Sequence, residues 1–364
     1  MRARNKAGAT ALVIAVAAST ALAAQPADAR AGRALPSRVI TQKLDGPFGL
    51  AKLGRHGFVV AENVSGQLTA VSPSGSQRAL FGKAPGLSGA AARGGKAYGV
   101  TGGPNEDGAP TGGRFGPSRV IAKNLRTGHV SVLANLLAYE LKHNPDGQVQ
   151  FVKGKPVDAL SNPFSMTATK GGILVADGGA NDVLKVNPRT GRVSTFFVPP
   201  TVKDVPACKG PDANSNPGTK GCDPVPTGVV QANGSVWVST LGAERPGAGR
   251  LYKLNPRNGH VRRVWKGLTS PTGIAVGRDG AIYFSQVLFG APEGDGPPPP
   301  GFDPSKVGRI VRIKDGHFTA AQVTMPTGLL ITDGTLYASA WSIASFLGIN
   351  HAGQVVQVER SLFK

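Results

Sequence analysis

Seven side chains that could bind a cation or a polar ligand lie in two nearby parts of the sequence. They supply carboxylate, amide and phenol oxygens, which accept hydrogen bonds and suit hard cations. The seven residues are Tyr139, Glu140, Asn144, Asp146, Asn162, Asp177 and Asn181. We predict that they form a ligand-binding site where the fold brings these two parts together.

The densest acidic turn in this set is DGGAND, residues 177–182. It lacks the closing glutamate of an EF-hand calcium loop, so we interpret it as a tight turn between two strands. A bound divalent cation is the alternative. We assign no obligatory cofactor and no metal site from the sequence.

The elements that would position these residues are copies of one repeated unit. A Pro-Thr-Gly or related motif opens each unit, followed by a short apolar strand, a glycine turn and two strands with period-2 alternation. Six such motifs begin at Pro47, Leu87, Pro163, Pro226, Pro271 and Pro326. Most units end in a hairpin turn and a fourth strand. We therefore predict an all-β fold, a six-bladed β-propeller.

The N-terminal segment is expected to close the ring. After Val358 too few residues remain for a turn and a fourth strand, whereas the strand-like residues 38–43 precede the first unit without a partner. Pairing them with the last blade would cover an exposed edge. We expect one propeller domain over residues 37–364; two stacked sheets or an open solenoid are the alternatives.

Long insertions are expected on only one face of this propeller. They fall in blade-to-blade links and in loops between second and third strands, namely 101–117, 134–162, 199–226, 241–248, 287–307 and 342–352. Long loops in a compact domain often carry function. We predict that this loop-rich face binds an unknown small molecule or protein; a solvated, variable rim is the alternative. Residues 134–143 are the best helix candidate.

Both cysteines, Cys208 and Cys222, lie in one insertion. An even pair in an exported chain indicates a disulfide bond. By the loop-entropy model it is worth about 3 kcal/mol, mostly to its own loop.

The first 29 residues have the pattern of a signal peptide. Arg2, Arg4 and Lys6 precede an Ala-rich apolar run, and residues 27–29 form a small-x-small cleavage site, with cleavage after Ala24 as a second choice. Residues 30–36 would be a short linker. We expect a secreted, extracellular monomer without a transmembrane segment in the mature chain; a retained N-terminal anchor is the alternative.

The chain is strongly basic, with a formal net charge of +20. Most acidic residues lie in the long insertions, so the short-turn face is predicted to be a basic surface. Such a surface favours anionic cell-surface polymer, lipid headgroups or nucleic acid, in a salt-dependent way. Nucleic acid is disfavoured because few aromatic side chains accompany the basic ones. A solvated surface without a partner is the alternative.

Evidence for catalysis is weak in this sequence. The six histidines are scattered, without an HExxH or Ser-His-Asp pattern. A metal-dependent hydrolase or lyase on this scaffold needs several oxygen ligands at the inner strands, where only Asp45 and Asn162 are available. We therefore favour a non-catalytic binding scaffold, with such an enzyme and an envelope-bound protein as alternatives.

The chain resembles the secreted propeller family named for scytonemin biosynthesis, the ScyD/ScyE-like proteins. The resemblance rests on LAYELKHNPDG (137–147), LSNPFSM (160–166), VADGGANDVLKV (175–186) and PVPTGV (224–229). It implies NHL-like blades and export but no assigned activity. The cysteine-bearing insertion and the basic balance depart from the pattern. Gluconolactonase-type and virginiamycin-B-lyase-type propellers are more distantly similar, and their catalytic residues cannot be placed here.

Overall fold

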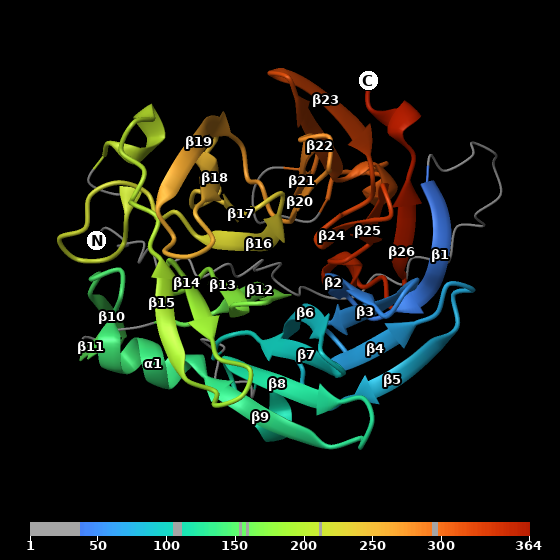
Figure 1. Cartoon of the computed structure of the whole chain (residues 1–364). Helices are drawn as coiled ribbons and strands as arrows, with labels where there is room; N and C mark the ends of the chain where they lie inside the picture. Colours follow the sequence, from blue (N-terminus) through green and yellow to red (C-terminus); the bar gives the residue numbers. More distant parts are fainter. Residues whose placement is uncertain (1–36, 105–110, 153–154, 158–159, 211–212, 293–297) are drawn as a thin grey trace.

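The computed structural model describes residues 37–104, 111–152, 155–157, 160–210, 213–292 and 298–364. Six four-stranded antiparallel sheets are arranged as blades around a central axis (Figure 1). This confirms the predicted six-bladed β-propeller. The predicted signal peptide (1–29) and linker (30–36) lie outside the described residues, as do short pieces of four insertions.

Each blade runs from an inner strand outward, and the strand bounds follow the sequence repeat. Blade 1 contains β2 (Pro47–Leu53), β3 (Gly57–Glu62), β4 (Gln67–Val71) and β5 (Gln77–Phe81). Blade 2 contains β6 (Leu87–Arg93), β7 (Lys96–Thr101), β8 (Arg119–Asn124) and β9 (Val130–Asn135). Blade 3 contains β12 (Pro163–Thr169), β13 (Gly172–Asp177), β14 (Asp182–Val186) and β15 (Val193–Phe197).

The second half of the ring repeats this order. Blade 4 contains β16 (Pro226–Ala232), β17 (Ser235–Thr240), β18 (Gly249–Leu254) and β19 (Val261–Leu268). Blade 5 contains β20 (Ile274–Val276), β21 (Ile282–Gln286), β22 (Arg309–Lys314) and β23 (His317–Gln322). Blade 6 contains β24 (Leu329–Thr332), β25 (Thr335–Ala340) and β26 (Gly353–Val358).

The N-terminal strand β1 (Ser37–Leu44) supplies the fourth strand of blade 6. It pairs antiparallel with β26, with Ser37 opposite Val358 and Leu44 opposite Gly353. The first and last parts of the chain therefore share one sheet, as predicted, and β26 is not left as an open edge.

The blade-opening motifs hold neighbouring blades together at the axis. Hydroxyl groups at these motifs donate to backbone carbonyls of the next blade: Ser88 to Pro163 (2.7 Å), Thr227 to Pro271 (3.0 Å) and Thr327 to Pro47 (3.1 Å). The next residue in the motif is glycine, because the inner strands of neighbouring blades approach closely at this position. A Cβ at Gly273 would overlap the carbonyl oxygen of Thr327. The Pro-Thr-Gly repeat is thus explained by inter-blade packing.

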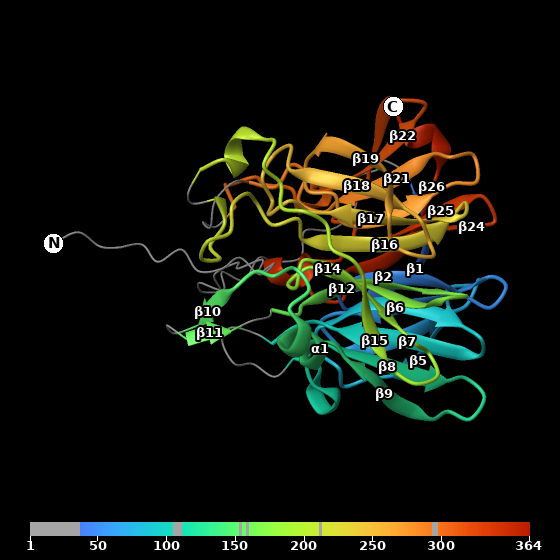
Figure 2. The ribbon, with the colours of Figure 1, turned by 60° about the vertical axis from the view of Figure 1, so that its left-hand side comes forward.

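The long insertions emerge together on one face, and short turns form the opposite face (Figure 2). The insertion 134–162 contains helix α1 (Leu136–His143) and a hairpin of β10 (Gln150–Val152) and β11 (Lys155–Val157). Single 3-10 turns interrupt four others: η1 (Gly113–Phe115), η2 (Pro206–Cys208), η4 (Pro304–Lys306) and η5 (Ala344–Leu347). A last turn, η6 (Arg360–Leu362), follows β26.

Two details of the insertion 134–162 differ from the sequence prediction. The helix begins at Leu136 rather than Ala134, because Ala134 pairs with Val120 in the sheet and the Asn135 side chain caps the helix by accepting from Ala138 N–H. The β10–β11 hairpin was not predicted. Within the described residues, no helix is long and apolar enough to span a membrane.

Candidate functional site

The structure brings four of the seven predicted site residues together between α1 and blade 3. Glu140 and Asn181 are buried, Asp177 is fully buried, and Asp146 is half-buried beside them. Asp146 accepts from the Asn181 amide at 3.1 Å and from Gln148 N–H at 3.0 Å. The two parts of the sequence therefore meet, as their positions in the repeat suggested.

The other three residues lie around this cluster and mainly hold the backbone. Asn144 ends α1 in the left-handed region and its amide donates to the Gln148 carbonyl. Asn162 accepts from Gly103 N–H at 2.8 Å, which ties blade 3 to the blade 2 insertion. Tyr139 lies on another side of α1, where its hydroxyl contacts Thr195 on β15 at 2.9 Å.

Asp177 organises the turn between β13 and β14. Its carboxylate accepts from Ser161 Oγ (2.6 Å), Asn162 N–H (2.6 Å) and Ala180 N–H (3.2 Å). Burial nevertheless raises the pKa of Asp177 to about 6, because these bonds only partly replace the lost water. This carboxylate acts as a structural acceptor.

Asp182, which the sequence analysis did not select, faces Glu140 inside the cluster. Both carboxyls are almost inaccessible to solvent. Burial, followed by the neighbouring charge of Asp177, raises the pKa of Glu140 to about 9. Burial and the charge of Glu140 raise the pKa of Asp182 well above its ordinary value. The sequence did not indicate that Asp182 is buried against Glu140, because an acidic residue at the start of a strand after a turn is usually solvated.

A second polar network joins this cluster to the cysteine-bearing insertion. Gln148 and Asn214 each donate to Asp223 at 2.8 Å, and Asn216 donates to Gln148 at 2.9 Å. Burial raises the pKa of Asp223 despite these bonds. Sequence reasoning missed this network, because its members lie 75 residues apart.

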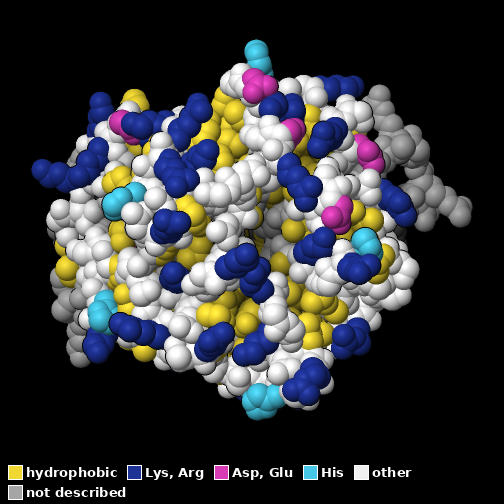
Figure 3. Space-filling view, in the orientation of Figure 1, with side chains coloured by type: hydrophobic (Ala, Val, Ile, Leu, Met, Phe, Trp, Pro, Cys, Tyr) yellow, Lys and Arg dark blue, Asp and Glu magenta, His cyan; other side chains and the backbone are white. Residues whose placement is uncertain are grey.

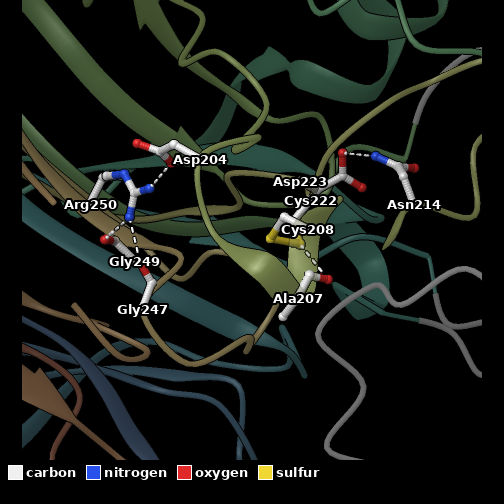
Figure 4. Close-up of a disulfide and its surroundings, with 9 residues drawn as sticks. All are labelled: Asp204, Ala207, Cys208, Asn214, Cys222, Asp223, Gly247, Gly249 and Arg250. Carbon is white, nitrogen blue, oxygen red and sulfur yellow. Dashed lines mark hydrogen bonds and ion pairs between the residues drawn. A yellow bond between two sulfur atoms is a disulfide. The ribbon is translucent and has the colours of Figure 1, made fainter. Parts of the chain in front are cut away.

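The disulfide bond predicted between Cys208 and Cys222 is present, and it is buried (Figure 4). An ion pair between Arg250 and Asp204 lies on one side of it, and Asp223 with Asn214 lies on the other. Arg250 also donates to the carbonyls of Gly247 and Gly249. The disulfide therefore closes the insertion 199–226 on itself, and the ion pair between Asp204 and Arg250 fixes the insertion to blade 4.

Aromatic side chains from two blades meet at the inner strands. Phe48 and Phe164, from the inner strands β2 and β12, contact each other with ring centroids 5.6 Å apart. The nearby Glu62 accepts from four donors, including Asp45 N–H at 2.8 Å. Asp45 itself contacts His351 Nδ1 at 2.6 Å.

The short-turn face is basic, as predicted. In Figure 3, Lys and Arg side chains are spread over all parts of this face, whereas Asp and Glu side chains are few. Exposed cations come from first-to-second-strand turns (Arg55, Arg93, Lys170 and Arg278) and from third-to-fourth-strand turns (Arg126, Arg189 and Arg257). Two acids of this face form ion pairs, Asp333 with Lys52 and Asp315 with Lys314.

Three of these arginines occupy the same position in consecutive blades. Each turn begins with an asparagine whose side chain accepts from the N–H of the arginine two residues later. The bonds are Arg126 to Asn124 (3.0 Å), Arg189 to Asn187 (2.9 Å) and Arg257 to Asn255 (3.0 Å). These Asx turns fix the backbone of each arginine. The three arginine side chains are thus attached to the backbone at equivalent positions on blades 2, 3 and 4.

A cavity of about 360 Å³ opens on the same face beside blades 4 to 6. Lys52, Arg278 and Arg360 contribute basic groups to its wall, and Asp279 and Asp333 contribute acidic ones. The Asn233 amide donates to the Gly277 carbonyl at 2.7 Å and joins two turns at its edge.

The architecture is that of a six-bladed β-propeller. No family model matches the chain, and no curated protein matches it either. Membership of the ScyD/ScyE-like family therefore remains a prediction.

Several solved structures are similar to this chain in fold. A luciferin-regenerating enzyme has a TM-score of 0.53 at 9% sequence identity, and the match covers 89% of this chain and 94% of the enzyme chain. A gluconolactonase from Xanthomonas campestris has a TM-score of 0.52 at 10% identity, covering 88% and 89%. A putative oxidoreductase (glucose dehydrogenase) from Thermus thermophilus has a TM-score of 0.51 at 13% identity, covering 88% and 98%. At such identities the likeness extends to the fold alone.

Proposed function

We propose that this chain is an exported, non-catalytic binding protein that attaches through its short-turn face to an anionic polymer of the cell envelope. The observation that carries the proposal is the repeated presentation of arginine from equivalent Asx turns of blades 2, 3 and 4. Guanidinium groups pair well with phosphate and carboxylate groups. A polymer carrying such groups could contact several blades at once.

The charge distribution supports this proposal over a general solubility role. A basic surface without a partner would be expected around the whole molecule, whereas most acidic residues of this chain lie in the long insertions. The short turns also leave the cations unshielded by loops. Contacts made at several blades add together, so a long polymer would bind more tightly than a single ionic group.

Export is part of the proposal and is supported by the sequence pattern of residues 1–29 and by the disulfide bond. The predicted loop-face site is less suited to direct contact with an external partner. Glu140, Asp177 and Asn181 are buried and face other protein groups. An enzyme of the gluconolactonase type is also disfavoured, because the axis holds Phe48 and Phe164.

Reversing the three equivalent arginines should weaken binding to an anionic polymer. We expect the variant R126E/R189E/R257E to bind fluorescently labelled polyphosphate at least about tenfold more weakly than the wild type at ~0.15 M salt, because exposed charge contacts contribute ~0.2–1 kcal/mol each and reversal adds repulsion. The measurement is a fluorescence-anisotropy titration at several salt concentrations.

The matched control reverses three exposed lysines of the loop-rich face, K142E/K209E/K220E, and changes the net charge by the same amount. At high salt the affinity of this control for polyphosphate should be within about twofold of the wild-type affinity. At every salt concentration the control should bind clearly more tightly than the arginine variant. Equal weakening by the two variants would mean that net charge alone governs binding, and the proposed face would be wrong.

A further inference from the structure

The contact between α1 and blade 3 contains carboxylate oxygens that no N–H or hydroxyl group of the protein reaches. Glu140 Oε1 and both carboxylate oxygens of Asp182 are buried and accept no hydrogen bond from another type of side chain or from the backbone among the described residues. The two carboxyls face each other closely enough to share a hydrogen bond, which requires that one of them carry a proton. Asp182 is 0% exposed and Glu140 is 1% exposed. Buried polar groups are nearly always paired, so three oxygens without such a donor at one place require an explanation.

Two neighbouring acidic side chains further disfavour the ionised forms of Glu140 and Asp182. Asp177 and Asp146 lie close enough to act on both carboxyls by their charge. Each is already held by protein donors, such as Ser161 for Asp177 and Asn181 for Asp146. Among the described residues, no Lys, Arg or His forms an ion pair with any of the four. Isolated buried carboxylates are strongly destabilising unless a proton or a cation neutralises them.

We propose that Glu140 and Asp182 bind one divalent cation, of which Ca²⁺ is the best match, between helix α1 and the β13–β14 turn. The available ligands are all oxygens, which Ca²⁺ prefers, and it accepts carboxylates in a mono- or bidentate mode. The proposal does not depend on what either face of the propeller binds.

The two carboxylates would provide only part of the coordination. In the described part of the chain, no group of three His, Cys, Asp or Glu side chains is arranged to hold a metal ion. Backbone carbonyls and water would complete the shell, as is usual for Ca²⁺, which takes six to eight oxygens. Asp146 and Asp177 would contribute negative potential while keeping their hydrogen bonds to Asn181 and Ser161.

A bound cation would connect an insertion to the propeller. Glu140 comes from the insertion 134–162, and Asp182 begins a strand of blade 3. Without the cation, their contact is repulsive whenever both carboxyls are ionised. With it, the helix would be fixed to the blade, and the loop-rich face would become more rigid.

The test is thermal unfolding of the purified chain in EDTA and in millimolar CaCl₂. We expect Ca²⁺ to raise the wild-type midpoint by about 5 °C, because a ligand well above its dissociation constant stabilises the folded state. In the variants Glu140→Gln and Asp182→Asn the rise should fall below about 1 °C. In EDTA, however, the same variants should unfold at or above the wild-type temperature, because each removes a buried repulsion.

The unfolding temperatures of wild type and variants should therefore rank in opposite order in CaCl₂ and in EDTA. A variant that merely damages the fold would unfold below the wild type in both buffers. The control Glu244→Gln removes an exposed acid from another insertion and should retain the full response to Ca²⁺. Isothermal titration of the wild type with CaCl₂ should give one site per chain. A wild type that does not respond to Ca²⁺ would overturn the proposal and leave a proton shared between the two carboxyls. A response retained by both variants would also overturn it.

Discussion

Replacing Gly273 by alanine is expected to destabilise the propeller by about 3 kcal/mol or more, enough to prevent folding in a marginal protein. An added Cβ would overlap the Thr327 carbonyl of blade 6 and crowd the Ser285 hydroxyl at 3.0 Å. Neither can move freely, since Ser285 Oγ donates to this carbonyl at 2.8 Å. The strands β20 and β24 would have to separate at the axis.

The measurement is urea unfolding of the alanine variant beside the matched control Gly82→Ala. Gly82 has no atom within 4 Å of the position of a Cβ, so its substitution should change the free energy of unfolding by no more than ~0.5 kcal/mol. If both variants unfold at the wild-type urea concentration, the blade-opening glycines do not act through close packing of the inner strands.

Removing β1 is expected to abolish the folded state. A chain that begins at Asp45 loses the whole β1–β26 pairing and the fully buried Leu44. It also loses contacts with blade 1, in which Thr41 Oγ1 donates to the Gly75 carbonyl at 2.9 Å and Gln77 donates to the Gln42 carbonyl at 2.6 Å. The exposed edge of β26 would favour aggregation. Such a chain should be recovered as aggregate or without a cooperative thermal transition.

The control begins at Arg30, after the predicted cleavage site, and should keep a single cooperative transition. The substitution Leu44→Ala provides a milder version and should lower the free energy of unfolding by ~2–5 kcal/mol. A soluble, cooperative chain beginning at Asp45 would show that five complete blades close without the N-terminal strand.

The fold could be predicted because the residues that make it are local and repeated. Four of the six blade-opening motifs carry both a hydroxyl and a glycine, and three of these hydroxyls, on Ser88, Thr227 and Thr327, make the inter-blade hydrogen bond. The unpaired residues 38–43 indicated the closing strand for the same reason. The start of α1 was less certain, because Asn135 serves both as the end of β9 and as the helix cap.

The candidate site was only partly predictable, because burial depends on how an insertion folds back. The sequence placed Glu140, Asp146, Asp177 and Asn181 in two suitable segments. It did not indicate that Asp182 faces Glu140 rather than solvent, since both orientations suit a residue after a turn. The contact between Phe48 and Phe164 was equally hidden, because it joins two blades across the axis.

Lysine footprinting in the presence of polyphosphate tests the proposed attachment surface most directly. The chain is acetylated briefly with and without the polymer at ~0.15 M salt, and each lysine is quantified by mass spectrometry. The short-turn face carries Lys52, Lys123, Lys170 and Lys185, and the loop-rich face carries the exposed Lys142, Lys203, Lys209 and Lys306. We expect the polymer to protect the first group and leave the second unchanged. Equal protection of both groups, or protection of the loop-rich face alone, would contradict the account.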